Sequence, residues 1–181
     1  MGMSKSVATI AALAIVTALG GAAAFASGDA NVTTVARIEQ VTDGDTVVLT
    51  NGGRVRLVQI DTPEVYFGVE CYGRQASATT KRLLPPGTLV RLAVEPKTDR
   101  VDGYGRLLRY VIRMRDGLNV NVRLVAVGAA APYFYFGRRG RFAGRLDRLA
   151  RRARAHHLGL WRACPGTPYR PTAAVQTGPS R

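Results

Sequence analysis

The sequence predicts an α+β domain in which a small antiparallel β-barrel of five strands is covered by helices. Short runs rich in β-branched residues, separated by tight turns, fill the first part of the chain, and such runs are typical of strands. One helical pattern interrupts the strands, and two more follow the last of them. The predicted strands span residues 32–41, 46–50, 54–60, 89–94 and 107–114.

Tight turns join the first three predicted strands. Asp43-Gly44 separates the first strand from the second, and Asn51-Gly52-Gly53 is a strong hairpin signal between the second and the third. Because both connections are short, we expect these strands to be neighbours in an antiparallel meander.

Three segments have the spacing of amphipathic helices. Residues 74–84 end at Pro85-Pro86-Gly87, which cannot continue a helix. Residues 119–127 precede Gly128, a typical C-cap, and residues 141–156 carry an apolar stripe with arginines on the other sides. The number and order of these elements are compatible with an OB-type barrel.

The composition is strongly basic. Among 181 residues, 26 lysines and arginines stand against 12 aspartates and glutamates, for a formal net charge of +14. This length suits one domain with its termini. The positive charge favours polyanionic partners, either nucleic acid or an anionic membrane surface. The alternative is an arginine-rich composition that serves no partner, because charge alone is only an association.

The N-terminal segment has the features of a targeting sequence. Lys5 supplies a positive start, residues 7–19 form an apolar run, and Ala24-Phe25-Ala26 fits a cleavage site between small residues. We therefore expect a signal peptide over residues 1–26 and a secreted or extracytoplasmic domain. The alternative is an uncleaved membrane anchor through residues 7–25, which places the domain on the same side of the membrane.

After a short leader at 27–31, we expect the folded domain to span 32–164. A disordered tail is expected at 165–181, which is rich in proline, threonine and glycine. The chain has two cysteines, Cys71 and Cys164. In an exported protein an even pair favours a disulfide, and two free thiols are the alternative. Two distant cysteines without a zinc-spaced histidine pair do not make a zinc site.

Three acidic residues follow turns or strand ends in the meander. Asp45 lies just past the first turn and Asp61 at the end of the third strand, so their carboxylates can converge. Carboxylates without a nearby thiolate or imidazole favour calcium or magnesium over zinc. Glu64 is placed to deprotonate a water near such an ion. The alternative is that the two aspartates only form turns and that Glu64 is an exposed loop carboxylate.

Arg56 and Arg106 are candidate phosphate ligands, because guanidinium groups bind phosphate in bidentate fashion and stabilise transition-state charge. Arg56 and Asp61 are separated by an odd number of residues on one predicted strand, so a regular strand points them to opposite faces. A bulge would bring both to one rim, but the sequence does not show one. For any single arginine in so basic a chain, surface solvation is the alternative.

Aromatic residues run from Tyr133 to Phe136 and precede Arg138 and Arg139. Aromatic side chains beside arginines suit base stacking along a phosphate track, and closure of the local core is the alternative. The segment 141–156 is also rich in arginine. Its surface is either an electrostatic footprint for a polyanion or a solvated basic face.

Taken together, these motifs resemble the staphylococcal nuclease (thermonuclease) family from about Val35 to Trp161. The order and spacing of the motifs carry the resemblance, since each piece alone is weakly specific. The matching stretches are VTDGDTV at 41–47, RLVQIDTPE at 56–64, YGRQA at 72–76, the segment 99–106 ending in DGYGR, the segment 121–128, and GLW at 159–161.

The resemblance implies an OB-fold barrel with three helices. It also implies a calcium-dependent nuclease that cuts DNA and RNA with little sequence preference and leaves 3′-phosphates. One Ca²⁺ would be held by Asp45, Asp61 and the carbonyl of Thr62. Glu64 would act as the general base or order the attacking water.

By the same resemblance, Arg56 and Arg106 would bind the scissile phosphate, with the curvature of the barrel bringing Arg56 to the acidic pocket. Tyr104 and Tyr133 would line the nucleotide pocket, with Tyr135 as a third aromatic. No obligate protein partner is implied, and we expect a monomer.

The sequence departs from the best-known family member at two places near the nucleotide. Phe136-Gly137 stands where that member has a Lys-Pro turn, and Gly103 replaces a lysine. Both changes bear on nucleotide affinity rather than on the metal or the base. The competing hypotheses are an OB-fold module that binds nucleic acid without cutting it and a basic envelope protein. The complete catalytic set favours the enzyme.

Overall fold

A computed structural model of the chain describes Met1, residues 33–66 and residues 68–179. Apart from Met1, the predicted signal peptide at 1–26 and the leader at 27–31 lie outside the described residues. Among the residues that the structure describes, each helix is too short or too polar to cross a bilayer.

Five strands close into a barrel in the order β1-β2-β3-β6-β5, with β5 pairing back onto β1. The predicted five-stranded α+β barrel is confirmed, with one correction to its direction. β3 and β6 pair in parallel, since the long connection through α1 and β5 can return the chain in either sense. The strands are β1 (Thr34–Val41), β2 (Thr46–Leu49), β3 (Arg54–Leu57), β5 (Leu89–Val94) and β6 (Leu107–Arg113).

The third strand is shorter than predicted, because β3 ends at Leu57 rather than at Ile60. Gln59 adopts a left-handed backbone with φ 66°, which costs an ordinary residue roughly 1–2 kcal/mol. Its side-chain amide compensates by donating to the carbonyl of Arg138 at 2.7 Å and accepting from the N–H of Gly140 at 2.7 Å. The chain then leaves the barrel as β4 (Ile60–Asp61), which pairs with β7 (Ala131–Pro132).

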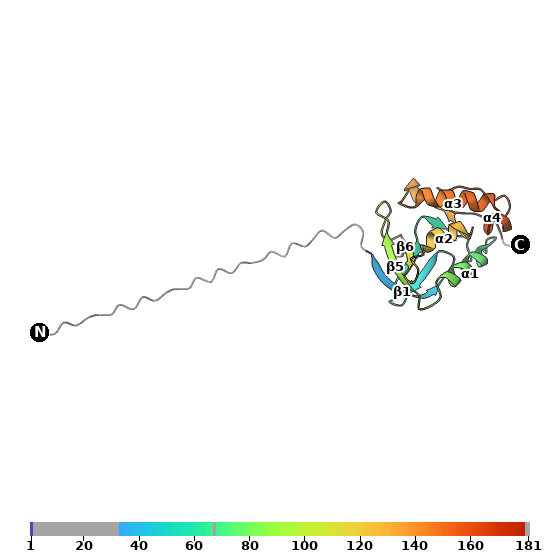
Figure 1. Cartoon of the computed structure of the whole chain (residues 1–181). Helices are drawn as coiled ribbons and strands as arrows, with labels where there is room; N and C mark the ends of the chain where they lie inside the picture. The colour runs from blue at the N-terminus through green and yellow to red at the C-terminus, as the bar shows by residue number, and fades with distance from the viewer. Residues whose placement is uncertain (2–32, 67, 180–181) are drawn as a thin grey trace.

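The three predicted helices are present as α1 (Gly73–Leu83), α2 (Val120–Ala126) and α3 (Ala143–Ala155). Two further elements, which the sequence pattern did not indicate, are a short α4 (Leu160–Ala163) and a 3₁₀ turn η1 (Tyr135–Gly137). Figure 1 shows α2 between the barrel and α3, in agreement with its contacts to both β6 and α3. Apolar residues from the strands and helices meet in a main core, among them Ile38, Val55, Leu92, Leu124 and Leu146. Two smaller apolar clusters accompany it.

The C-terminal segment differs from the prediction of disorder over residues 165–179. It runs back across the domain, where the carbonyl of Pro171 accepts from the N–H of Phe134 at 2.6 Å. Farther along, the carbonyl of Gly178 accepts from the N–H of Cys71 at 2.8 Å. Composition predicted disorder because proline, threonine and glycine have little apolar surface to bury. These contacts rely instead on backbone groups, which composition does not register.

Candidate active site

The turn after β1 is built around the carboxylate of Asp43. Its Oδ1 accepts hydrogen bonds from the N–H groups of Asp45 at 3.0 Å and Thr46 at 2.7 Å. Burial raises the pKa of Asp43, although the hydrogen bond from Thr46 and the charge of Arg56 offset part of that effect. Asp43 is therefore the turn-forming residue that fixes the direction of Asp45.

Asp45 is held against the loop after β4. Its Oδ2 accepts from both the N–H and the hydroxyl of Thr62, at 3.0 Å and 3.1 Å. The close approach needs a glycine at position 44, since a Cβ there would lie 2.4 Å from Oγ1 of Thr62. The carbonyl of Gly44 accepts from the hydroxyl of Thr80 on α1 at 2.5 Å. Helix α1 and the loop after β4 thus clamp the turn from two sides.

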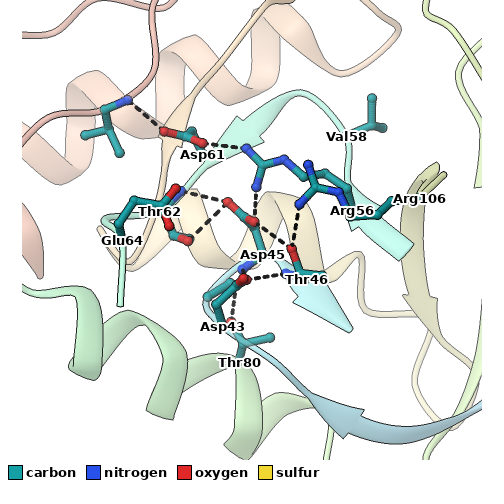
Figure 2. A network of polar contacts seen from close by, with 12 residues as sticks. Asp43, Asp45, Thr46, Arg56, Val58, Asp61, Thr62, Glu64, Thr80 and Arg106 are labelled. Atoms are coloured by element: carbon teal, nitrogen blue, oxygen red, sulfur yellow. Dashed lines mark hydrogen bonds and ion pairs between the residues drawn. The ribbon is translucent and has the colours of Figure 1, made fainter. Parts of the chain in front are cut away.

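Asp45 and Asp61 converge on Arg56, as Figure 2 shows. Nη1 of Arg56 forms an ion pair with Oδ1 of Asp45, and Nη2 lies 2.5 Å from Oδ1 of Asp61. Both carboxylates are buried, with 2% and 5% of the residue exposed. Two buried carboxylates with a single shared cation form a site that favours further positive charge.

The break at Gln59 explains how Arg56 and Asp61 meet despite their odd separation. β3 pairs with β2 so that Arg56 lies opposite Thr46, the residue after Asp45. The left-handed residue then turns the chain out of the barrel, so the alternation of a regular strand no longer applies to Asp61. This irregularity takes the place of the bulge that the odd separation of Arg56 and Asp61 called for, and the sequence did not show where it would lie.

Glu64 lies in the loop between β4 and α1, next to the acidic pair (Figure 2). Its N–H donates to Oε2 of Glu70 at 2.9 Å, and its carbonyl accepts from the N–H of Glu70 at 2.9 Å. Partial burial raises the pKa of the Glu64 carboxyl, and the negative charges of Asp61 and Asp43 raise it further. A carboxylate with a raised pKa is a better general base than an ordinary one.

Arg106 reaches the same cluster from the loop before β6. Its Nε donates to Oδ2 of Asp102 at 2.7 Å, and its Nη1 donates to the hydroxyl of Thr46 at 3.3 Å. That hydroxyl in turn donates to Oδ1 of Asp45 at 3.3 Å. The predicted site residues Arg56, Asp61 and Arg106 are thus linked to Asp45 by hydrogen bonds or ion pairs.

Asp102 is a site residue to which the sequence analysis gave no role. Burial alone would raise its pKa, but hydrogen bonds from the backbone and side chain of Arg106 outweigh burial and lower it. Its Oδ1 also accepts from the N–H of Tyr104 at 2.9 Å. The carboxylate therefore shapes the loop and orients the arginine. The tight-turn sequence around Gly103 was the available signal for this role.

The predicted aromatic residues differ in their exposure and in their contacts to the cluster. Tyr104 is 77% exposed, and the guanidinium carbon of Arg106 lies 5.3 Å from its ring centroid. Tyr133 and Tyr135 are in edge contact, with centroids 6.1 Å apart. Burial raises the pKa of Tyr133, with the charge of Asp61 adding to the effect. Of the four consecutive aromatics, Phe134 is fully buried, so core closure accounts for that residue.

The donor atoms of the cluster suit a hard cation but form an incomplete cage. Within the described part of the chain, no three His, Cys, Asp or Glu side chains are grouped to hold a metal ion. Asp45 and Asp61 supply two buried carboxylates beside Thr62, without imidazole or thiolate. Hard divalent cations accept such oxygen ligands together with waters, so the residues fit an ion whose coordination is completed by solvent or substrate.

Comparison with known proteins identifies the family of the chain. A sequence model described as staphylococcal nuclease homologue matches residues 54–163, which include Arg56, Asp61, Glu64 and Arg106. The chain belongs to the staphylococcal nuclease homologue family.

Several relatives within this family are named as nucleases. The chain is 33% identical over 130 residues to the SPbeta prophage-derived endonuclease YokF of Bacillus subtilis (strain 168), covering 68% of this chain and 43% of that protein. It is 33% identical over 130 residues to the thermonuclease of Staphylococcus intermedius, covering 68% and 74%. An uncharacterized endonuclease of Escherichia coli O157:H7 is 34% identical over 128 residues, covering 69% and 75%. The match thus spans less than half of YokF and about three quarters of the other two.

Proposed function

We propose that this protein is an exported, calcium-dependent nuclease that hydrolyses phosphodiester bonds of DNA, RNA or both and leaves 3′-phosphates. The observation that carries the proposal is the meeting of Asp45, Asp61 and Arg56 at one rim of the barrel, with Glu64 and Arg106 beside them. Membership of a family whose relatives are named as nucleases supports the same reaction class.

Asp45, Asp61 and the carbonyl of Thr62 would hold the calcium ion. When bound, such an ion neutralises phosphate charge and polarises the phosphoryl group. Arg56 bridges both carboxylates in the structure. Phosphate binding therefore requires its guanidinium to exchange at least one of these partners for a phosphate oxygen, with which it can form a bidentate pair.

Glu64 would accept the proton of the attacking water at a carboxylate oxygen. As water attacks phosphorus, the bond to the 5′-oxygen breaks, the 5′-oxygen takes up a proton, and the phosphate stays on the 3′ side. Arg56 and Arg106 would stabilise the negative charge that develops on the equatorial oxygens. Asp102 keeps Arg106 oriented through the Nε bond, so the guanidinium does not have to be ordered during the reaction.

Exposed aromatic and basic side chains outside the cluster would bind the rest of the strand. Tyr104 and Tyr135 are 77% and 54% exposed, and base stacking on such rings tolerates any sequence. The basic surface of α3 adds phosphate contacts that depend on salt concentration. Its exposed arginines are Arg145, Arg148, Arg151, Arg152 and Arg154. These same features would suffice for a module that binds nucleic acid without cutting it.

Cleavage assays separate the nuclease from the binding module. Purified protein is incubated with plasmid DNA and with RNA, first in calcium and then in excess chelator, and the product ends are mapped. We expect cleavage in calcium only, with 3′-phosphate ends. Binding without cleavage in calcium would show a non-catalytic module, and cleavage in chelator would refute the metal requirement.

Export is tested separately by expressing the full chain with its own N-terminus. We expect a secreted product that begins at Ser27, because Ala24-Phe25-Ala26 precedes it. An intact N-terminus in the membrane fraction would support the uncleaved anchor instead.

A further inference from the structure

The C-terminal segment 165–179, here called the C-terminal strap, reaches the same acidic cluster from the far end of the chain. The backbone N–H of Val175 donates to Oδ2 of Asp61 at 2.8 Å, and both residues are buried. Oδ1 of Asp61 faces Arg56. One oxygen of this carboxylate therefore contacts the barrel through Arg56, and the other contacts the strap through Val175.

The strap is fastened to the loop that carries Glu64. The hydroxyl of Thr177 donates to the carbonyl of Cys71 at 2.7 Å, and the N–H of Cys71 donates to the carbonyl of Gly178 at 2.8 Å. Glu70, whose backbone and carboxylate both bond to Glu64, forms a β-bridge with Pro179. The last described residues of the chain thus hold the segment that follows the candidate base.

The disulfide closes the strap into a fixed loop. Cys164 directly precedes the strap and is bonded to Cys71, and Cys71 also contacts the far end of the strap through Thr177 and Gly178. One covalent bond therefore fixes the start of the strap beside the place where it ends.

Contacts in the middle of the strap hold Val175 in position beside Asp61. The hydroxyl of Tyr169 donates to Oδ1 of Asp147 on α3 at 2.5 Å. The side chain of Val175 packs into an apolar cluster formed by Ala131, Ala153, Leu160, Trp161 and Cys164. Ala131 is the β7 partner of Asp61, so the seat of Val175 is built next to the carboxylate that its N–H contacts.

We propose that the C-terminal strap is a positioning element of the active site. It orients the Asp61 carboxylate through the N–H of Val175 and holds the Glu64 loop through Cys71. The inference rests on the proposed function, because it assigns the strap to support of the calcium-binding carboxylate. Hydrogen bonds behind a metal ligand fix its orientation, and their loss typically lowers metal affinity or activity by about 10- to 100-fold.

Two substitutions at one position separate the hydrogen bond from the packing. Val175→Pro removes the N–H that contacts Asp61, whereas Val175→Ala keeps that N–H and removes part of the apolar side chain. Ala174→Pro places the same ring at the exposed neighbouring residue. Calorimetric titration with calcium alone gives the affinity of each variant, and a thermal melt in chelator gives its stability.

We expect calcium affinity to fall by roughly tenfold in Val175→Pro, to fall clearly less in Val175→Ala, which keeps the N–H, and to stay within about twofold of the parent in Ala174→Pro. A cooperatively folded Val175→Pro protein with unchanged calcium affinity would overturn the proposal. Equal losses in Val175→Pro and Val175→Ala would do the same, because they would assign the effect to packing.

If Val175→Pro gives no cooperative melt, calcium affinity is measured instead on a truncated chain that ends at Ala174. It lacks the donor to Asp61 and the contacts to Cys71 but keeps Tyr169 and Pro171. Reduced calcium affinity in this folded truncation supports the proposal. Failure of both variants to fold would show a structural role only and would overturn the positioning role. If the unaltered protein binds calcium but cleaves nothing, the proposed function fails while the strap proposal remains measurable.

Discussion

Two regions of the molecule meet at Asp61 and differ in how the chain builds them. The acidic rim, residues 43–64, is formed by strands that are neighbours in the sequence, and its Asp45, Arg56 and Asp61 interact directly. The C-terminal strap reaches Asp61 from more than one hundred residues away. The rim carries the side chains proposed to bind the metal and to catalyse cleavage. The strap contacts Asp61 through a backbone N–H and is fastened beside it by both backbone and side-chain contacts.

Breaking the rim is expected to have one of the two largest effects on stability. Arg56→Met leaves two buried carboxylates without their shared cation, and breaking a buried pair in this way costs about 3–5 kcal/mol. The free energy of unfolding, measured by denaturant titration in chelator, should fall by that amount. Calcium should restore part of the loss, because the ion supplies the missing positive charge.

Arg54→Met is the matched control, since Arg54 is exposed on the same strand and its side chain donates to the carbonyl of Tyr104 rather than to a carboxylate. Equal stability of the two variants in chelator would contradict the shared-cation account of the rim.

Opening the disulfide that anchors the strap is expected to have an effect of similar size. Replacing both Cys71 and Cys164 by serine opens a disulfide with a sequence separation of 93 residues. The entropic model assigns such a closure roughly 4–5 kcal/mol, which corresponds to roughly 8–20 °C in melting temperature for a protein of this size. The unaltered protein in reducing agent should melt at the same temperature as the double variant. A double variant that melts like the oxidised parent would show that the disulfide adds nothing to stability.

A smaller loss of stability is expected from crowding the turn that precedes Asp45. Gly44→Ala places a methyl group 2.4 Å from Oγ1 of Thr62, and overpacking of this kind costs roughly 1–3 kcal/mol. Calcium affinity should fall as well, because Thr62 would move away from Asp45. Gly103→Ala is the control, since its methyl group meets no atom within 4 Å. Thermal melts and calcium titrations that rank the two variants equally would contradict the close packing of the turn.

The smallest effect concerns pH. The pKa of Glu64 is raised in the folded protein by burial and by Asp61 and Asp43, so the folded state binds this proton more tightly than the unfolded state. Glu64 therefore lowers stability as pH rises from the unfolded pKa to the folded pKa, and Glu64→Gln should be slightly more stable at neutral pH. Unfolding curves of the two proteins should converge at acidic pH, and a difference that grows on acidification would contradict the direction of the pKa shift.

Much of the rim could be predicted from the sequence, because its contacts follow from local rules. Asp43-Gly44 is a turn-forming dipeptide between β1 and β2. The turn places Asp45 directly before β2, beside β3. The meeting of Arg56 and Asp61 was different. It depends on the left-handed Gln59, and that conformation depends on hydrogen bonds to Arg138 and Gly140, which lie far along the chain.

The strap could not be predicted in the same way. Pro171, Val175 and Gly178 contact Phe134, Asp61 and Cys71 through backbone N–H and carbonyl groups. Every residue type except proline offers the same pair of groups, so the sequence carries no signal of which ones are used. The cysteine pair was the one local clue, since it indicated that the chain end lies near the loop after Glu64.

The most direct test of the catalytic rim compares Glu64→Gln with Glu39→Gln, an exposed carboxylate on β1. The single-turnover rate of cleavage of a defined DNA strand is measured in saturating calcium, with melts to confirm folding. A general base contributes roughly 10²- to 10⁴-fold to the rate, so we predict a loss of that size in Glu64→Gln and an unchanged rate in Glu39→Gln. A folded Glu64→Gln protein that cleaves as fast as Glu39→Gln would contradict the assignment of Glu64 as the base.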